Sequence, residues 1–425
     1  MTDQKTLVMI SSSLNPDLLH TPRKMGLKVV LVAAAPPRDP AAFDCHLPVD
    51  ELDEDAVLDA VLGYIAEHGE VHAVATFHEG SLHVAARLAK ELGLPGNSPE
   101  AARAMRDKFL TGRILAEAGV GTPVTLLATT LDQARAAARQ LGYPLVVKPQ
   151  SGASSQGVIK VRDDAELDAA FTLVNDLYRV REFTDGQFSA PNLGHIFFYP
   201  NLRGVLVQEY VTGEEVAIDL VYGDGVFEAL AIHDKPVPFA EHHFFETTYV
   251  TPSVLPQAVQ RDVVDTAVNA LRALGATVGA AHVELRVTDA GPKIIEVNGR
   301  LGGTTAYVQE SIRESTGVWG PLEYLRAVLG ERPRGPQGRR GHAGFTPLMA
   351  ERTGRIERFE GVEEVERMPG VIGIRWMSRP GDHLVVKYPE NPASYFALVL
   401  ARGEDRAEVL RALREAERVL RPVYC

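Results

Sequence analysis

A β-hairpin is the strongest local signal in the chain. Residues 280–305 read AAHVELRVTDAGPKIIEVNGRLGGTT, and the segment 288–292 carries the residues that usually reverse the direction of a chain. Strands are expected on either side of this turn, at 282–287 and at 293–300.

Side chains alternate between the two faces of a strand, and the second strand therefore has a polar and an apolar face. Glu296, Asn298 and Arg300 are expected to point to one side. Ile295 and Val297 are expected to point into a core.

The polar face of this hairpin could hold a metal ion. Glu284 can lie beside Glu296, so that two carboxylates and the amide carbonyl of Asn298 converge into the kind of oxygen site that Mg²⁺ prefers. Arg300 could hold a phosphate or a carboxylate in a bidentate fork. Taken alone, the hairpin fits a solvated acidic face equally well.

The composition is typical of a globular protein and disfavours several partners. A chain of 425 residues is expected to form two to four domains. Apolar residues make up 45%, and the net charge of −12 argues against nucleic acid as a partner, because phosphate binding needs a basic face. The two cysteines provide no disulfide framework, which fits the cytoplasm. Neither a signal peptide nor a membrane span of about 20 apolar residues is expected.

Short apolar strands alternate with helical segments over residues 1–95, which predicts a parallel sheet covered by helices. We expect a Rossmann-like domain here, without a dinucleotide, because its first turn lacks the GxGxxG pattern. Glu79 follows the third expected strand, at the edge where open sheets place ligands. A surface helix cap is the commoner explanation of a glutamate at such a position.

Two lysines stand at the ends of regular elements farther along the chain. Lys108 opens an expected helix that runs to Ala118, and Lys148 ends an expected strand that starts at Tyr143. A loop of small residues at 151–157 follows and can lay backbone N–H groups over phosphates. It lacks the glycine–lysine signature of a Walker-type loop, which is therefore excluded.

Three further segments are recognisable. Residues 179–204 form an aromatic-rich insertion, expected to be a loop or a lid. His242 and His243 could suggest a metal, but a solvent-facing pair is more common where no further ligand stands at matching spacing. The segment 331–344, rich in arginine, proline and glycine, is expected to lead into a separate small α+β unit that packs on the main body.

The polar features occur in a fixed order: Lys108, Lys148, the loop 151–157, the strand end at 208–211, Glu215, Glu284 and finally Glu296-x-Asn298-x-Arg300. This ordered set resembles the ATP-grasp superfamily over roughly residues 95–330. The resemblance implies an α/β and α+β fold with three parts: a Rossmann-like domain at 1–95, an ATP-grasp domain at 96–330 with a smaller subdomain at about 122–210, and a C-terminal α+β domain at 340–425.

The resemblance also implies a role for each residue. Those expected to bind the nucleotide are Lys108, Lys148, Ser151, Ser154, Ser155, Gly157, Gln208, Glu209, Val211 and Glu215. Those expected to bind the metal are Glu284, Glu296 and Asn298. Arg300 is similar to the arginine that steadies the acyl-phosphate and the tetrahedral intermediate. His233 and Lys235 are candidates for orienting the acyl-phosphate or assisting deprotonation of the amine, and a structural role at a strand end explains them equally well.

Several segments look more specifically like the bacterial L-amino acid ligases. They are Ala231 to Lys235, Thr247 to Ser253, Asn298 to Gly303, and the C-terminal pieces around Arg355 and Met368. Gly299 stands where proline is common in that branch.

This resemblance implies an enzyme that uses ATP and Mg²⁺, with Mn²⁺ as a substitute, to join a carboxylate to an amine through an acyl-phosphate. The expected partners are small carboxylates and amines, amino acids above all, and a homodimer is compatible with it. Two alternatives stay open: another ATP-grasp enzyme of the purine-pathway or carboxylase type, and a nucleotide-binding protein without catalysis.

Overall fold

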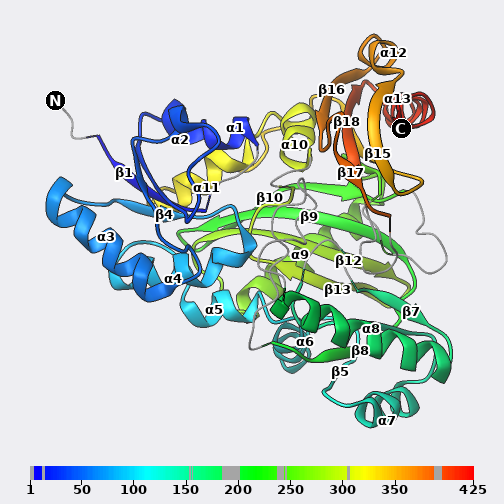
Figure 1. Cartoon of the computed structure of the whole chain (residues 1–425). Helices are drawn as coiled ribbons and strands as arrows, with labels where there is room; N and C mark the ends of the chain where they lie inside the picture. Colours follow the sequence, from blue (N-terminus) through cyan, green and yellow to red (C-terminus); the bar gives the residue numbers. More distant parts are fainter. Residues whose placement is uncertain are drawn as a thin grey trace.

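Four β-sheets with helices around them make up the described part of the chain (Figure 1). The computed structural model describes residues 4–11, 15–152, 155, 157–183, 202–236, 244, 247–303, 307–386 and 395–425. In Figure 1 the N-terminal unit lies at the left and the C-terminal region at the upper right, with the central strands of the largest sheet between them.

The N-terminal unit contains a parallel sheet in the order β3-β2-β1-β4. Its strands are β1 (Thr6–Ile10), β2 (Lys28–Val32), β3 (Cys45–Leu47) and β4 (Ala73–Ala75). The expected Rossmann-like arrangement is confirmed. The short strand β3 was not indicated by the sequence pattern.

Both faces of this sheet are covered. The helices α3 (Glu54–His68) and α4 (Leu82–Glu91) pack on the face that carries Val8 and Ile10. The opposite face packs on the rest of the protein. Burial on both sides explains why the strands are short and almost wholly apolar.

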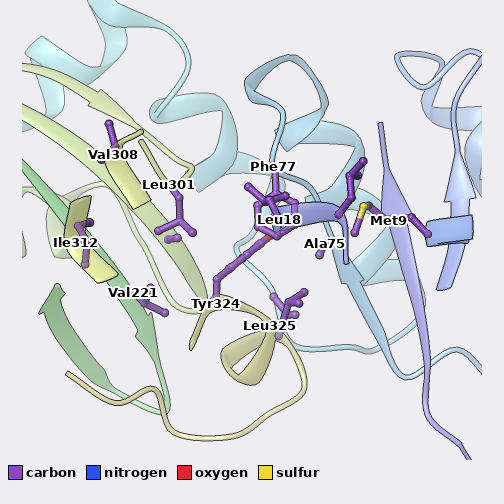
Figure 2. Close-up of a cluster of buried hydrophobic side chains, with 14 of the residues drawn as sticks. Met9, Leu18, Ala75, Phe77, Val221, Leu301, Val308, Ile312, Tyr324 and Leu325 are labelled. Carbon is purple, nitrogen blue, oxygen red and sulfur yellow. The ribbon is translucent and has the colours of Figure 1, made fainter. Parts of the chain in front are cut away.

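A shared hydrophobic core joins the N-terminal unit to the largest sheet (Figure 2). Met9 of β1 and Phe77 belong to the same cluster as Tyr324 of α11 (Gly320–Val328). The rings of Phe77 and Tyr324 lie 5.4 Å apart, and the Tyr324 hydroxyl accepts a hydrogen bond from the Thr76 N–H at 3.2 Å. The end of β4 is therefore fixed against α11.

The largest sheet has eight strands in the order β13-β12-β9-β10-β11-β14-β18-β16, and all neighbouring strands are antiparallel. Its strands are β9 (Glu214–Gly223), β10 (Val226–Asp234), β11 (Tyr249–Thr251), β12 (Gly279–Thr288), β13 (Gly291–Asn298), β14 (His342–Met349), β16 (Val371–Trp376) and β18 (Tyr395–Gly403). The amphipathic helix α9 (Gln257–Ala273) packs on one of its faces.

The C-terminal strands continue this sheet, which differs from the expectation of a separate unit. β14 pairs with β11, with Thr251 opposite Ala343, and α13 (Arg406–Val419) packs on β14 and β18. A three-stranded sheet of β15 (Gly354–Glu360), β17 (His383–Leu384) and β19 (Arg421–Tyr424) lies beside it. The domain boundary near residue 340 stays a prediction, because no break in the sheet marks it.

The smaller subdomain expected at about 122–210 contains a sheet of its own in the order β5-β8-β6-β7. Its strands are β5 (Thr125–Ala128), β6 (Leu145–Pro149), β7 (Ile159–Val161) and β8 (Val205–Glu209). The helices α7 (Leu131–Leu141) and α8 (Asp164–Phe183) cover one face. The limits of this subdomain stay a prediction.

The hairpin of β12 and β13 has the expected register, with a bulge. Glu284 lies opposite Glu296, but Leu285 lies opposite Ile294, which leaves Ile295 as an extra residue on β13. Ile294 and Val297 are buried in the core, whereas Ile295 is half-buried and lines a cleft. The expectation that Ile295 points into the core is therefore wrong, because the bulge shifts the alternation by one residue.

The remaining elements are short or connect the sheets. They are α1 (Pro16–Leu19), α2 (Thr21–Lys24), α5 (Pro99–Ala104), α6 (Lys108–Glu117), α10 (Val308–Thr316), α12 (Val362–Glu366) and the 3₁₀ turns η1 (Pro40–Ala42) and η2 (Glu79–Ser81). Most of the insertion at 179–204, together with His242 and His243, lies outside the described residues. Among the helices that are described, none has both the length and the apolar character needed to cross a bilayer.

The bulge predicts unequal effects for two neighbouring isoleucines. Ile294→Ala should lower the free energy of unfolding by about 2–5 kcal/mol, because it leaves a cavity in the core. Ile295→Ala should cost about 1 kcal/mol, because that side chain lies at the cleft. Urea unfolding followed by circular dichroism measures both, and equal losses would contradict the bulged register.

Candidate active site

A cleft between the small sheet and the largest sheet gathers most of the polar residues that the sequence singled out. It is lined by Lys108, Val146, Lys148, Pro149, Gly152, Ser155, Val158, Gln208, Glu209, Tyr210, Val211, Glu215, Lys235, Phe244, Glu284, Arg286, Ile295 and Glu296. Lys148 comes from β6 of the small sheet and Lys108 from α6, whereas Glu284 and Glu296 come from the hairpin and Glu215 from β9.

Lys148 is a buried cation in this cleft without an anionic partner. It is the fourth residue of β6 and only 4% exposed, and no hydrogen bond or ion pair reaches its ammonium from the described residues. Burial lowers the pKa of Lys148 to about 8, and nearby Lys108 also lowers it, although Glu296 and Glu284 act in the opposite direction. A buried, unpaired ammonium is costly, so this position favours an anionic ligand.

Lys108 is held at the first position of α6. The Asp107 carboxylate caps the helix by accepting hydrogen bonds from two backbone N–H groups, those of Phe109 and Leu110. The Lys108 ammonium lies 2.8 Å from the Glu296 carboxylate and donates to the carbonyl of Gly152 at 2.9 Å. Lys108 therefore connects the hairpin to the small-residue loop.

The three expected metal ligands lie together on the hairpin. Glu284 and Glu296 are opposite each other, and Asn298 follows on the same face. The Asn298 amide, in the orientation that satisfies its hydrogen bonds, donates to Glu296 at 3.2 Å. Burial would raise the pKa of Glu284, but Lys235, His282 and Arg300 outweigh burial and hold that pKa below its usual range. Both carboxylates thus have cations nearby, which offset the repulsion between the two negative charges while no metal is bound.

Lys235 and Glu215 form a second charged group at the wall of the cleft. The Lys235 ammonium lies 2.6 Å from Glu215 and 3.7 Å from Glu284, and Arg286 pairs with Glu215 at 2.8 Å. Burial raises the pKa of Glu215, with the negative charge of Glu284 adding to the effect. Glu215 therefore lines the cleft and is already engaged by two cations, and its role toward a ribose stays a prediction.

Glu79 belongs to the site, and the interpretation of Glu79 as a surface cap is wrong. It is 7% exposed, pairs with Arg106, and accepts a hydrogen bond from Arg300 at 3.2 Å. Burial would raise the pKa of Glu79, but Arg106, Arg300 and Lys108 lower it to about 2. The β4 end of the N-terminal sheet thus supplies the carboxylate that orients Arg300.

His282 is a site residue that the sequence analysis missed. Its Nδ1 lies 2.9 Å from Asp219 and its Nε2 lies 3.6 Å from Glu284. Burial would lower the pKa of His282, but Asp219 and Glu284 raise it to about 10, so the ring is an imidazolium. Strand alternation could have found it, because His282 and Glu284 are two residues apart on one face of β12.

His233 lies apart from the cleft. It is fully buried, and its Nε2 is 2.8 Å from the Ser311 hydroxyl of α10. Burial lowers the pKa of His233 to about 4. The geometry thus fits the structural alternative, because the ring is buried and does not line the cleft.

The expected adenine hinge lies at the edge of the same cleft. The Gln208 amide donates to the Thr125 hydroxyl at 2.7 Å, and Lys293 pairs with the Glu209 carboxylate at 3.2 Å. Both side chains are therefore engaged, and the segment between β8 and β9, including Val211, lines the cleft.

The small-residue loop is described only in part. Ser151 is fully buried and its hydroxyl donates to the carbonyl of Leu202, so it does not face the cleft. Ser155 lines the cleft, and Gly157 has a left-handed φ of 71°. Ser154 lies outside the described residues.

Three family models match the chain in order. They are an ATP-grasp N-terminal domain at residues 19–96, an ATP-grasp domain at 141–307 and the C-terminal domain 2 of L-amino acid ligases at 347–424. The chain belongs to the ATP-grasp superfamily, in its L-amino acid ligase branch. The recognition made from the ordered polar residues is therefore confirmed.

Curated relatives and a solved structure fit this assignment. An alanine–anticapsin ligase of Bacillus amyloliquefaciens is 31% identical over 57% of this chain and 50% of its own length. A carnosine synthase 1 of Gallus gallus is 30% identical over 72% of this chain and 33% of its own length. The chain thus spans half or less of these two relatives. An L-amino acid ligase from Bacillus licheniformis is 26% identical, with full coverage of both chains and a TM-score of 0.81.

The oxygen atoms that the hairpin offers are too few to hold a divalent metal alone, and they fit one whose other ligands come from a bound phosphate compound. Within the described residues, no group of three or more histidine, cysteine, aspartate or glutamate side chains is arranged to hold a metal ion. Glu284 and Glu296 supply two carboxylates, and Asn298 can supply an amide oxygen. Mg²⁺ in proteins is usually bound by one or two carboxylates together with substrate phosphates, and the hairpin residues match that pattern.

The unpaired ammonium of Lys148 predicts proton uptake when ATP binds. At pH 8 roughly half of the Lys148 side chains are neutral, and bound phosphates should raise the pKa, so about 0.5 proton should be taken up per ATP. As the pH rises through about 8, ATP affinity should fall. Calorimetry in two buffers with different ionisation enthalpies measures the uptake. Lys148→Met should abolish it and weaken ATP binding by roughly 10- to 100-fold, whereas unchanged uptake in this variant would rule out Lys148 as the source.

Proposed function

We propose that this chain is an ATP-dependent carboxylate–amine ligase that joins an amino acid to an amine or to a second amino acid. The observation that carries the proposal is the cleft in which Lys108 and Lys148 face Glu284 and Glu296. Two cations suit a polyphosphate, and two carboxylates suit the divalent ion that accompanies it. Membership of the L-amino acid ligase branch supports the same reading.

Different residues of the cleft would bind different parts of the nucleotide. Lys108 and Lys148 would hold the phosphates, and the backbone after Gln208 and Glu209 would hold the adenine edge. Glu215 would accept from the ribose hydroxyls. Glu284, Glu296 and Asn298 would hold Mg²⁺, which when bound lowers the cost of the negative charge on the transferred phosphoryl group.

The reaction requires two displacements. A substrate carboxylate oxygen attacks the terminal phosphorus of ATP, the bond to the bridging oxygen breaks, and ADP leaves with an acyl-phosphate remaining. The neutral amine then attacks the acyl carbon, the bond to the phosphate oxygen breaks, and phosphate leaves while the amine nitrogen loses a proton. Arg300 is anchored by Glu79 and lowers the pKa of Glu284 by its charge, and it would stabilise the oxygen that becomes negative in the second step.

Lys235 receives the orienting role, and the general base stays unassigned, because an ammonium held between two carboxylates already carries its proton. Its ammonium pairs with Glu215 and Glu284 and is 3% exposed on its side chain. In this charged surrounding it would orient the acyl-phosphate by its positive charge. His233 receives no role, because it is buried against Ser311.

The named relatives support amino acids as substrates. One relative is named for joining alanine to anticapsin, and another for synthesising carnosine. A screen of amino-acid pairs should therefore show ADP release that depends on both members of at least one pair, with mass spectrometry detecting the ligated product. Binding of ATP without ADP release for any pair would favour a nucleotide-binding protein, and release with bicarbonate instead of amino acids would favour a carboxylase.

Arg300 gives a second test of the chemistry. Arg300→Ala should lower the turnover number by roughly 10²- to 10³-fold, while the dissociation constant of ATP changes little, because Arg300 does not line the nucleotide cleft. Arg300→Lys keeps the charge but loses the bidentate fork, so its turnover number should lie between those of the natural protein and of Arg300→Ala. Glu79→Gln is the matched control for orientation, because it leaves Arg300 in place but weakens its anchor. Turnover that persists in Arg300→Ala would remove Arg300 from the mechanism.

A further inference from the structure

The two lysines of the cleft differ in what they touch. Among the described residues Lys148 has no anionic partner, whereas the Lys108 ammonium lies 2.8 Å from Oε1 of Glu296. Both side chains of this ion pair are largely buried, at 13% and 22% exposed. The pair therefore forms in a setting where its attraction is only partly screened by water.

The same oxygen of Glu296 has a second donor. The Asn298 amide nitrogen reaches Oε1 of Glu296 at 3.2 Å and also reaches Glu79. A carboxylate oxygen offers two lone pairs, and Lys108 and Asn298 use both. A metal ion approaching Oε1 would meet an ammonium at hydrogen-bond distance and an amide that presents its N–H groups instead of its oxygen.

The position of Lys108 allows it to change partners. It stands at the first turn of α6, and its ammonium also donates to the carbonyl of Gly152 at the start of the small-residue loop. A polyphosphate in the cleft carries several negative charges, against the single charge of Glu296. The ammonium should therefore move toward the phosphates when the nucleotide arrives.

We propose that Lys108 is a counter-ion that is exchanged between Glu296 and the nucleotide. In the free protein Lys108 occupies Glu296 and keeps divalent metal from binding there. Nucleotide binding draws Lys108 to the phosphates, and Glu296 then becomes available to the metal that the phosphates bring with them. This inference rests on the proposed nucleotide site, and it assigns an order in which the nucleotide precedes or accompanies the metal.

The experiment measures Mn²⁺ binding to the full chain without nucleotide, by electron paramagnetic resonance of the free ion. Lys108→Met removes the counter-ion, so Mn²⁺ affinity should rise by at least about fivefold, the lower end of typical coupling between sites. The double variant Lys108→Met with Glu296→Gln should lose this gain, because the released carboxylate is then absent. An unchanged or lower Mn²⁺ affinity in Lys108→Met overturns the proposal.

Lys148→Met is the matched control. It removes a lysine from the same cleft, with the same loss of positive charge but without an ion pair to Glu296. Its Mn²⁺ affinity should rise at least threefold less than that of Lys108→Met. Equal gains in the two variants would overturn the proposal, because they would show that the total positive charge of the cleft, and not the ion pair with Glu296, opposes the metal. Lys108→Gln should repeat the gain, and melting temperatures close to that of the natural protein show that both variants are folded. Because no turnover is measured, a failure of the ligase proposal would leave this result interpretable.

Discussion

The register of β12 against β13 places the carboxylates of Glu284 and Glu296 side by side, and like charges at such positions destabilise a sheet. The arrangement can persist only where cations lie close by. Lys235 and His282 approach Glu284, and Lys108 approaches Glu296. The two carboxylates of the hairpin therefore require positive charges on the elements that pack around them.

Apart from His282, which stands on β12 itself, those cations come from distant parts of the chain, so the site depends on how the sheets pack. Lys108 stands on α6 and Lys235 follows β10, while Arg300, beyond the hairpin, is anchored by Glu79 of the N-terminal unit. The apolar contact of Phe77 with Tyr324 fixes the segment that follows β4, two residues before Glu79. A hydrophobic core thus sets the position of a buried carboxylate, and that carboxylate sets the position of an arginine.

Local patterns predicted the parts of the site that follow from a single element. Strand alternation placed Glu296 and Asn298 on one face, and the helix start placed Lys108 correctly. The bulge at Ile295 could not be predicted, because it depends on pairing between two strands. The burial of Glu79 likewise depends on contacts between residues more than two hundred positions apart, such as Glu79 with Arg300, which no local pattern contains.

The charged groups in and around the cleft also differ in the pH range over which each keeps its charge. Glu79, with a pKa near 2, and His282, with a pKa near 10, keep their charges throughout the neutral range, because each has buried partners of opposite sign. Lys148 has no such partner in the described part of the chain, and its pKa near 8 means that it loses its charge as the pH rises through about 8. The ion pairs thus keep the hairpin in its arrangement, while the unpaired lysine keeps a positive charge available for an incoming anion.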